Sequence, residues 1–459
     1  MESFRHSVRS FNTSIASHFF TNNSFNYLGM TSIWSKAQSI ADATPPSRNR
    51  SVDFLRALSI LVVIFGHWLM ASPWRDTNGD HMGHILTWAP WSHYLTWIFQ
   101  IMPIFFFVGG YSNGITWDAA HRDGIPYREW FFARVRRLLK PVLILIMFWP
   151  AAGWIALKCG MPAIYLEVGS EVALVPVWFL AVYSLMVALA PLMRTLWHRY
   201  GLLSLFTPLA LAVIGDILYF TNTAPALGWA NYVTLWLAVH QLGFVWLDRR
   251  IKNQWVPWLC FIFGIVSLVC MTSFGPWPTS MIGVPGEEIS NSTPPHLPLL
   301  SLAAIQFGFV LIIERRLEAW LARGAVWTAT VLISSMIMTV FLWHSTMMML
   351  SYGVGFWFDF GLHTLPGADG WWTLHMLWTI AFLAVLIPIS GLLSRFERPR
   401  PSTKPAPPTW RLLSGVLLCA WGLSQLALHG VTELDVEQIA WLRVATPFAG
   451  AAVAGLIWR

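Results

Sequence analysis

Long apolar runs recur along this chain, and they constrain its fold more than any other feature. Each run spans about 18 residues or more, the length that an α-helix needs to cross the ~30 Å hydrocarbon core of a bilayer. Only 11% of the residues are charged and the mean hydropathy is +0.55. A soluble domain carries about 25% charged residues. The sequence therefore predicts an all-α, polytopic transmembrane helical bundle and excludes a soluble fold.

The apolar runs predict about twelve spans of ordinary transmembrane length. They cover roughly 54–73, 94–117, 139–157, 173–193, 201–220, 229–247, 255–273, 298–314, 326–350, 371–393, 411–429 and 438–458.

These spans divide the chain into four parts. Residues 1–50 are rich in Ser, Asn and Thr and lack the apolar core of a signal peptide, so a poorly ordered cytoplasmic tail is expected, with Met30 as an alternative start to Met1. The main membrane domain covers 51–395. A cytoplasmic Pro-rich linker over 396–410 then leads to two additional C-terminal spans within 411–459.

The net charge of +7 comes from basic residues that lie between the apolar runs. With the N-terminus inside, the inner loops hold Arg122, Arg128, Arg134, Arg136, Arg137, Lys140, Arg194, Arg199, Arg249, Arg250, Lys252, Arg315, Arg316, Arg323, Arg395, Arg398, Arg400, Lys404 and Arg411. The outer loops hold only Arg75 and Lys158, among many carboxylates. Because Lys and Arg collect in cytoplasmic loops, this asymmetry predicts a cytoplasmic N-terminus and an even number of spans. No basic stripe with interleaved aromatic residues lies outside the spans, so no nucleic-acid partner is expected.

Signatures of common soluble enzymes do not occur in this sequence: there is no GxSxG elbow, phosphate-binding loop, GxGxxG or HExxH. The four cysteines form no CxxC pair and are interpreted as small buried hydrophobes. His81-x-x-His84 and His93 have loose metal-like spacing but no further close ligand, so no metal is expected. Polar residues inside the spans are then the functional candidates, because they are costly in lipid.

The first span carries the most informative pair, Arg56 and His67. They are eleven residues apart, about three helical turns plus ~20°, so both project from one face with ~16 Å between them along the axis. Asp53 lies one turn before Arg56 and can pair with it. One interpretation is an ordinary cytoplasmic anchor and a histidine that bonds two helices. The other is an anion-binding group near the cytoplasm and a titratable base deep in the membrane.

Three later features bear on this choice. In the second span, Pro103 and Gly109–Gly110 predict either a kink with close backbone approach or simple helix packing. Arg134 and Arg137 are neighbours on a helix face and suit a phosphate-bearing ligand, or else mark topology. A second histidine, His344, is expected in the outer half of the ninth span.

Other polar groups are open to two interpretations. His240-Gln241 and Asp216 either line the same cavity or join helices. The long outer loop over 274–297, which holds a glycosylation sequon at Asn291, is the candidate acceptor-facing element or a plain connection.

Together these residues resemble the acyltransferase-3 family of integral membrane acyltransferases. The matching elements are Arg56-Ala57 with ten residues before His67, the Met-Pro-x-Phe-Phe-Phe run of the second span, Arg134-x-x-Arg137 and Phe-Leu-Trp-His344. The resemblance runs from about Ser51 to Arg395. Two features depart from the family: Gly109-Gly110-Tyr111 stands where it often has Ser-Gly-Phe/Tyr, and the two C-terminal spans exceed its ten-span core.

The resemblance implies an O-acyltransferase of the cell membrane. Such a protein moves an acyl group, commonly acetyl, from cytoplasmic acyl-CoA to a hydroxyl of an extracytoplasmic carbohydrate or lipid, with the lipid bilayer as its setting. In this chain Arg134 and Arg137 would bind the acyl-CoA phosphates, with Arg56 at the mouth. His67 would act as general base or be acylated as a nucleophile. His344 would orient His67 or the acceptor, or be structural.

Two other classes compete with this interpretation. A transporter or exporter of an acylated or small anionic solute shares the polytopic bundle, but no internal repeat of the first-span pattern is visible. The other large family of membrane-bound O-acyltransferases, also built around an intramembrane histidine, would use His344 and leave Arg56 and His67 unexplained. The identities of the acyl chain and the acceptor, and the oligomeric state, do not follow from the sequence.

Overall fold

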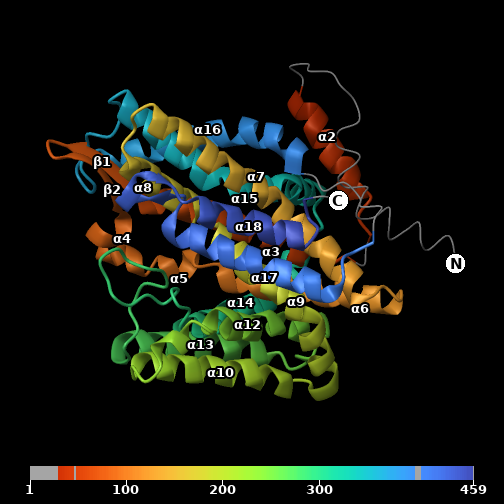
Figure 1. Cartoon of the computed structure of the whole chain (residues 1–459). Coiled ribbons are helices and arrows are strands. Elements are labelled where there is room, and N and C mark those ends of the chain that lie inside the picture. The colour runs from red at the N-terminus through yellow and green to blue at the C-terminus, as the bar shows by residue number, and fades with distance from the viewer. Residues whose placement is uncertain (1–28, 46–47, 398–404, 458–459) are drawn as a thin grey trace.

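The computed structural model describes residues 29–45, 48–397 and 405–457, and these form a bundle of helices running between two ends (Figure 1). Two short antiparallel hairpins, β1–β2 and β3–β4, are the only sheets in the described part of the chain. The predicted all-α helical bundle is confirmed.

The elements of the first half begin near one end with a short helix and continue through the first spans. They are α2 (Gly29–Asp42), α3 (Arg50–Met70), β1 (Ala71–Asp76), β2 (Gly79–His84), α4 (Ile85–Trp88), η1 (Pro90–His93), α5 (Thr96–Phe99), α6 (Met102–Arg122), α7 (Tyr127–Lys158), α8 (Ala163–Leu174) and α9 (Val177–Tyr200).

The second half completes the bundle. Its elements are α10 (Leu203–Phe220), α11 (Pro225–Gly228), α12 (Asn231–Leu247), α13 (Trp255–Phe274), α14 (Pro298–Leu321), α15 (Gly324–Trp357), α16 (Trp371–Glu397), α17 (Thr409–His429), β3 (Thr432–Glu433), η2 (Leu434–Val436), β4 (Gln438–Ile439) and α18 (Trp441–Val453).

Ten helical segments of the described residues are long and apolar enough to cross a membrane. They coincide with ten of the twelve predicted spans. Of the other two, α12 has 17 residues, at the short end of the range for a spanning helix. α18 has only 13 residues, or roughly 20 Å at 1.5 Å per residue. The predicted span over 438–458 is therefore shorter than expected, because the β3–β4 hairpin occupies its first residues.

Helix α2 lies where the sequence predicted a poorly ordered tail over 1–50. Residues 1–28 lie outside the described residues, whereas Gly29–Asp42 form a helix that packs on α15. Ala41 is buried with Trp327 and Val331 of α15. Polar side chains of α2 such as Gln38 and Ser39 remain exposed, while Ala37 and Ala41 are buried.

Glycines bring α6 and α12 into backbone contact. A Cβ on Gly110 would lie 1.8 Å from the His240 carbonyl oxygen, and one on Gly243 would lie 2.1 Å from the Phe107 carbonyl oxygen. α6 continues as one helix through Gly109 and Gly110. Of the two interpretations for these glycines, the structure therefore shows close helix packing without a break.

The break in the second span lies earlier, at Gln100–Ile101, between α5 and α6. The Gln306 side chain of α14 fills the gap: its Nε2 donates to the Gln100 carbonyl (2.9 Å) and its Oε1 accepts from the Ile104 N–H (3.2 Å). An unpaired backbone group in a bilayer costs several kcal/mol. One glutamine thus permits α6 to start at this point.

Helix α3 begins and ends at defined residues. The Asn49 side chain accepts from the Val52 N–H (3.2 Å) at its start, and Asp53 lies in the first turn, where a carboxylate favours the helix dipole. At the other end Ala71 is extended, and its N–H donates to the His67 carbonyl. The chain then passes directly into β1, so the end of α3 and the β1–β2 hairpin form one continuous unit.

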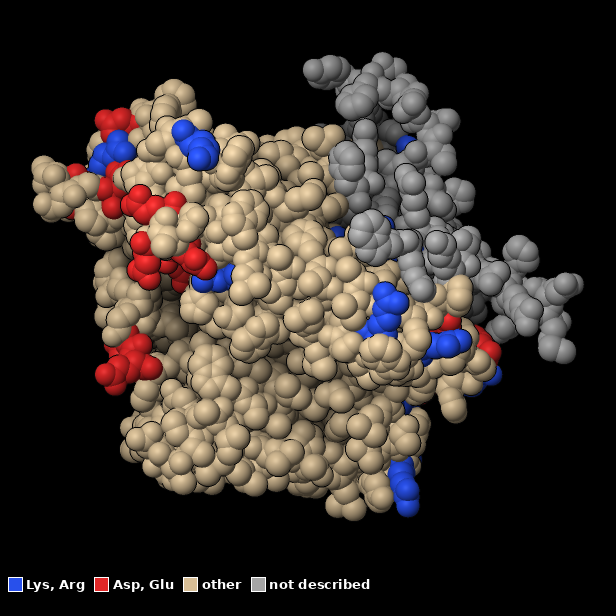
Figure 2. Space-filling model, in the orientation of Figure 1, with Lys and Arg blue, Asp and Glu red and all other residues tan. Residues whose placement is uncertain are grey.

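Charges are unevenly distributed between the two ends of the bundle. Figure 2 shows acidic side chains gathered at the end that carries β1, β2 and α8, with few at the far end. The arginines of α3 and the start of α7 lie toward the opposite end of their helices. The bundle is therefore polarised along its helix axes.

Candidate active site

His67 of α3 and His344 of α15 lie side by side in the bundle. His67 Nδ1 is 3.0 Å from His344 Nε2, and the ring centroids are 5.1 Å apart. His344 is fully buried, whereas His67 keeps part of its surface accessible. The Ser345 Oγ is 3.1 Å from His344 Nε2 and 3.4 Å from His67 Nδ1. Helices far apart in the sequence thus form a two-histidine site.

The hydrogen bonds assign the protons of this pair. His344 Nδ1 lies 2.6 Å from the Phe341 carbonyl oxygen, which can only accept, so Nδ1 carries the proton. In the neutral imidazole, His344 Nε2 is then an acceptor, and His67 Nδ1–H donates to it. His67 Nε2 is left with a free lone pair and makes no hydrogen bond to any described residue. That nitrogen is equipped to take a proton or attack a carbonyl.

Aromatic side chains hold both histidines in place. The Trp68 Nε1–H donates to the His344 carbonyl (3.2 Å), which ties α3 to α15 next to His67. On α7, the Trp149 Nε1–H donates to Thr346 Oγ1 (3.1 Å), two residues after His344. Trp68 is fully buried. The pair is therefore positioned by packed rings, as an acid–base site requires.

Arg56 lies about three turns from His67 on α3, as predicted. Its Nη2 donates to Ser112 Oγ of α6 (2.5 Å), and its Nη1 is 3.4 Å from Asp53 Oδ1. Asp53 is shared, because its other oxygen accepts from Arg48 Nε (2.5 Å). One carboxylate thus serves two arginines, and the site keeps an excess of positive charge.

Arg134 of α7 makes hydrogen bonds to uncharged side chains of α6. Its Nη2 donates to Asn113 Oδ1 (2.6 Å) and its Nη1 to Thr116 Oγ1 (3.0 Å). Asn113 is fully buried and its Nδ2 donates to His240 Nε2 (3.0 Å). The guanidinium also lies over the Trp130 ring, 5.4 Å from its centroid. These contacts orient Arg134 and leave its charge unneutralised.

Arg137 completes what we call the arginine cluster, Arg56, Arg134 and Arg137. Both α7 arginines lie within electrostatic range of Arg56. Arg137 is exposed and makes no hydrogen bond or ion pair with any residue that the structure describes. Three guanidinium groups thus converge with a single shared carboxylate, an arrangement suited to a phosphate or another polyanion.

A wall of aromatic rings connects the arginine cluster to the histidines. The Tyr183 hydroxyl lies within hydrogen-bonding range of Arg134. The Tyr183 ring stacks on Phe179 at 5.3 Å, and Phe179 is 6.0 Å from Phe341, whose ring is 6.0 Å from His344. A Cβ on Gly109 would lie 2.9 Å from the Tyr183 hydroxyl oxygen. The Tyr183 hydroxyl therefore packs against the backbone of Gly109.

The remaining candidates separate into two groups. His240 belongs to the site through Asn113, whereas Gln241 bonds Ser204 (3.0 Å) and joins α12 to α10. Asp216 accepts from Asn231 Nδ2, the Leu297 N–H and Trp277 Nε1 and contacts His296 Nδ1 (2.8 Å), so it fixes the long loop between α13 and α14 to α10.

Two further sequence candidates, the Asn291 sequon and the histidines of β2, have the following surroundings. Asn291 is fully buried and its Nδ2 donates to two backbone carbonyls, so the sequon is not available for glycosylation. His81 and His84 are three residues apart on strand β2, so their side chains point to opposite faces of the hairpin. Within the described residues, no group of three potential ligands is placed to hold a metal ion.

Several residues of the site have no signal in the sequence. Ser112, Asn113 and Thr116 resemble ordinary polar residues at a span end, and Tyr183 resembles an interfacial aromatic. Asn113 and Thr116 lie three residues apart on α6 and face Arg134, a spacing that helical periodicity alone can suggest. Their partners on α7, α9 and α12 come from the fold.

Comparison with known proteins agrees with this geometry. A membrane bundle with an intramembrane histidine pair and an arginine cluster defines a candidate membrane-embedded transferase. Residues 49–395 match the family model described as an acyltransferase domain. The chain therefore belongs to the acyltransferase-3 family, and it is an integral membrane acyltransferase that acylates hydroxyl groups. The family match favours the acyltransferase interpretation over the transporter interpretation.

No curated protein and no solved structure matches the chain.

Proposed function

We propose that this acyltransferase moves an acyl group, acetyl in the simplest case, from cytoplasmic acyl-CoA to a hydroxyl of an extracytoplasmic glycan or glycolipid. The observation that carries the proposal is the placement of two unlike groups on one helix. Arg56 belongs to an arginine cluster short of carboxylates, and His67, about three turns further along α3, pairs with His344. One end of α3 suits an anionic donor and the other suits proton transfer.

The donor would dock with its phosphates on the arginine cluster. Arg134 is oriented by Asn113 and Thr116 with its charge unpaired, and Arg137 is exposed. Charge-assisted bonds from guanidinium to phosphate are among the strongest in proteins. From there the extended pantetheine arm of CoA would follow the aromatic wall of Tyr183, Phe179 and Phe341, over the ~16 Å that separate Arg56 from His67 along the axis.

The proposed chemistry uses the free lone pair of His67 Nε2. The acceptor oxygen attacks the thioester carbonyl carbon while Nε2 takes the hydroxyl proton, and the carbon–sulfur bond breaks. The departing thiolate takes that proton back from His67, which gives an ester and CoA thiol. His344 accepts from His67 Nδ1–H throughout and so holds the productive tautomer. If His67 is acylated first, the same nitrogen is the nucleophile.

The charge distribution supports the orientation that we propose. Basic residues cluster in the segments 119–140, 194–199, 249–252 and 315–323, and acidic side chains gather at the β1–β2 end (Figure 2). With the N-terminus in the cytoplasm of a cell-membrane protein, the arginine cluster faces the acyl-CoA pool and the β1–β2 end faces outward. A reporter fused at 123–126 would then report a cytoplasmic location.

The test is transfer by the purified protein in liposomes supplied with labelled acetyl-CoA and an extract of the source cell envelope. We expect label to appear in alkali-labile esters. His67→Ala should lower the transfer rate by about 10²- to 10⁴-fold, the usual contribution of a general base. His363→Gln is the matched control, since His363 is an exposed histidine of the loop after α15.

The control variant should transfer at the wild-type rate, and both variants should elute as the wild type does on size exclusion. A well-folded His67→Ala protein with wild-type transfer would refute the role of His67.

A further inference from the structure

A third histidine, His84, lies next to His67 at the base of the β1–β2 hairpin. β1 follows α3 directly, and the hairpin register pairs Ala71 with His84. The Ala71 N–H donates to the His67 carbonyl. Paired residues of an antiparallel ladder have Cα atoms about 4.5–5.5 Å apart. His84 is therefore one strand away from the residue bonded to His67, and the two imidazoles are within electrostatic range of each other.

The hydrogen bonds of His84 assign its proton. Its Nδ1 accepts from the Leu86 N–H (3.3 Å), where it caps the short helix α4. Burial, together with nearby His93, lowers the pKa of His84 to about 4, so the ring is neutral at pH 7. A neutral imidazole that accepts at Nδ1 carries its proton on Nε2. His84 thus presents a hydrogen-bond donor.

His67 and His84 therefore offer complementary nitrogens. His67 Nε2 has a lone pair and His84 Nε2 has a proton, and neither bonds any residue in the described part of the chain. Both side chains are half-buried, in contrast to the fully buried His344. A neutral polar group left unpaired in such a position is costly unless a ligand or solvent contacts it.

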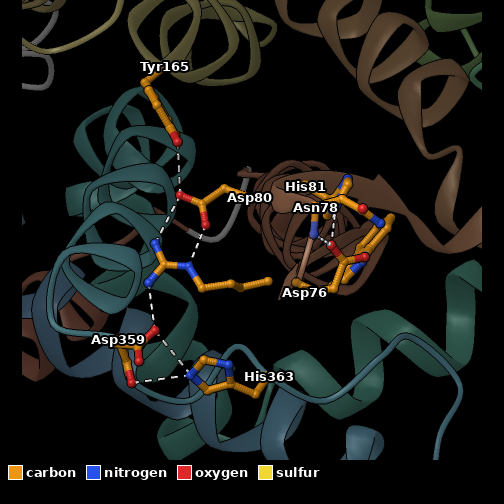
Figure 3. A network of polar contacts seen from close by, with 9 residues as sticks. Asp76, Asn78, Asp80, His81, Tyr165, Asp359 and His363 are labelled. Atoms are coloured by element: carbon orange, nitrogen blue, oxygen red, sulfur yellow. Dashed lines mark hydrogen bonds and ion pairs between the residues drawn. The ribbon is translucent and has the colours of Figure 1, made fainter.

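The hairpin that carries His84 is firmly anchored. Arg75 of β1 donates from Nε and Nη2 to both oxygens of Asp80 (2.5 and 3.0 Å) and from Nη1 to Asp359 Oδ1 (2.6 Å). The Tyr165 hydroxyl of α8 donates to Asp80 Oδ2 (3.1 Å). Figure 3 shows Asp80 between Tyr165 and the loop that carries Asp359 and His363. Since that loop follows α15, the network fixes the hairpin relative to the helix of His344.

We infer that His84 is an acceptor-binding residue: its Nε2–H donates to a second oxygen of the acceptor, beside the hydroxyl whose proton passes to His67 Nε2. The inference rests on the proposed function and names the acceptor class more closely. A molecule with oxygens on adjacent carbons, such as a sugar ring or a polyol, satisfies both nitrogens at once. A monohydric alcohol satisfies only His67.

His84→Asn is the test variant. The asparagine side-chain oxygen can still accept from the Leu86 N–H, because Asn is a strong helix cap, but the Nε2–H is lost. The assay follows CoA release from acetyl-CoA by the full chain in liposomes, with and without the envelope extract. We expect the KM for the extract to rise roughly 10-fold or more, as for one lost hydrogen bond in a buried site. The KM for acetyl-CoA and the release without extract should stay at wild-type values.

His93→Gln is the matched control, because His93 lies beside His84 and bonds the Leu86 carbonyl through Nε2 (2.8 Å), a bond that a Gln amide can replace. It should leave the KM for the extract unchanged. A wild-type KM for the extract in His84→Asn would overturn the inference, and so would an equal rise in the KM for acetyl-CoA. A wild-type protein that releases no CoA under any condition would instead reject the proposed function, and the inference with it.

Discussion

Two arginine sites share helix α6 and use their charge in opposite ways. In the arginine cluster, Arg134 bonds the neutral side chains of Asn113 and Thr116. Further along the same helix, Asp118 accepts from Arg194, which is only 3% exposed and also bonds both oxygens of Asp248. The first arrangement orients a charge, and the second cancels one.

The difference separates a binding role from a structural role. All three guanidinium nitrogens of Arg194 bond two carboxylates, so Arg194 joins α6, α9 and the end of α12 and its charge is not available to a phosphate. The cluster has three guanidinium groups and one shared carboxylate, which is unfavourable for the empty protein but suited to an incoming anion. Charge balance, more than the number of arginines, then distinguishes a ligand site from a structural ion pair.

The largest expected effect on stability is at Arg194, whose charge is neutralised by Asp118 and Asp248. Arg194→Leu leaves Asp118 and Asp248 facing each other without the guanidinium between them, and removing one partner of a buried ion pair costs about 3 kcal/mol or more in the free energy of unfolding. We expect a clearly lower melting temperature in detergent, measured by loss of monodisperse protein on size exclusion after heating.

The matched control also removes the two carboxylates that Arg194→Leu leaves without a partner. In the triple variant Arg194→Leu, Asp118→Asn, Asp248→Asn, much of the lost stability should return, because no unpaired carboxylate remains. If the single and the triple variant melt at the same temperature, the loss comes from packing and Arg194 is not primarily an ion-pair residue.

Substitutions in the arginine cluster should weaken donor binding and leave the melting temperature unchanged. Arg134→Gln should raise the KM for acetyl-CoA roughly 10- to 100-fold, since hydrogen bonds to charged groups contribute about 1.5–3 kcal/mol. Arg137→Gln, at an exposed position, should raise it roughly 3- to 10-fold. Neither should lower the melting temperature, because each substitution relieves repulsion between arginines. Initial rates in liposomes and the melting assay measure both quantities.

The dependence of the KM for acetyl-CoA on ionic strength is the control for these two variants. Raising the ionic strength should raise the KM for acetyl-CoA of the wild type, and less so for Arg137→Gln, because an exposed charge is the most strongly screened. A melting loss in Arg134→Gln comparable to that of Arg194→Leu would mean that the cluster is structural, and the contrast between the two sites would disappear.

Much of this site could be predicted from the sequence because it rests on single-helix geometry. Arg56 and His67 share one helix, so their spacing alone predicts a common face. The apolar runs likewise predict most of the spans. His344 stood out because a polar residue within an apolar run is conspicuous. These predictions use only local periodicity and composition.

The rest depends on contacts between distant segments. Gln306 permits the break before α6 although it lies some two hundred residues away, so composition gives no hint of it. Arg194 looked like a topology marker, since its carboxylates come from two other helices. The β1–β2 hairpin does have a local signal: in Asp76-Thr77-Asn78-Gly79, Asp at the first position and Gly at the fourth are typical of a β-turn. Recognising it would have separated His81 from His84 by position in the strand.

The smallest expected effect comes from Arg75, which is paired with two carboxylates as Arg194 is but lies near the surface. Hydrogen bonds from Arg75 hold the pKa values of Asp80 and Asp359 below their usual range. A carboxyl whose pKa is lower in the folded state stabilises the fold above its unfolded pKa, about 3.9, and this contribution is lost as the pH falls through the folded value. The melting temperatures of wild type and Arg75→Gln should therefore differ slightly and constantly between pH 7 and about pH 5, and converge below about pH 4.

Comparing Arg75 with Arg194 separates the effect of burial on stability from the effect of ion pairing. Arg75 and Asp359 have side-chain exposures of 28% and 63%, against 3% for Arg194. Exposed ion pairs contribute little to stability because water already solvates both partners. If Arg75→Gln melts only slightly below the wild type while Arg194→Leu melts far below it, burial determines how much a paired arginine contributes to the stability of this bundle. Equal losses would assign the effect to pairing alone, and the positive excess of the arginine cluster would then be the feature that still distinguishes the proposed donor site.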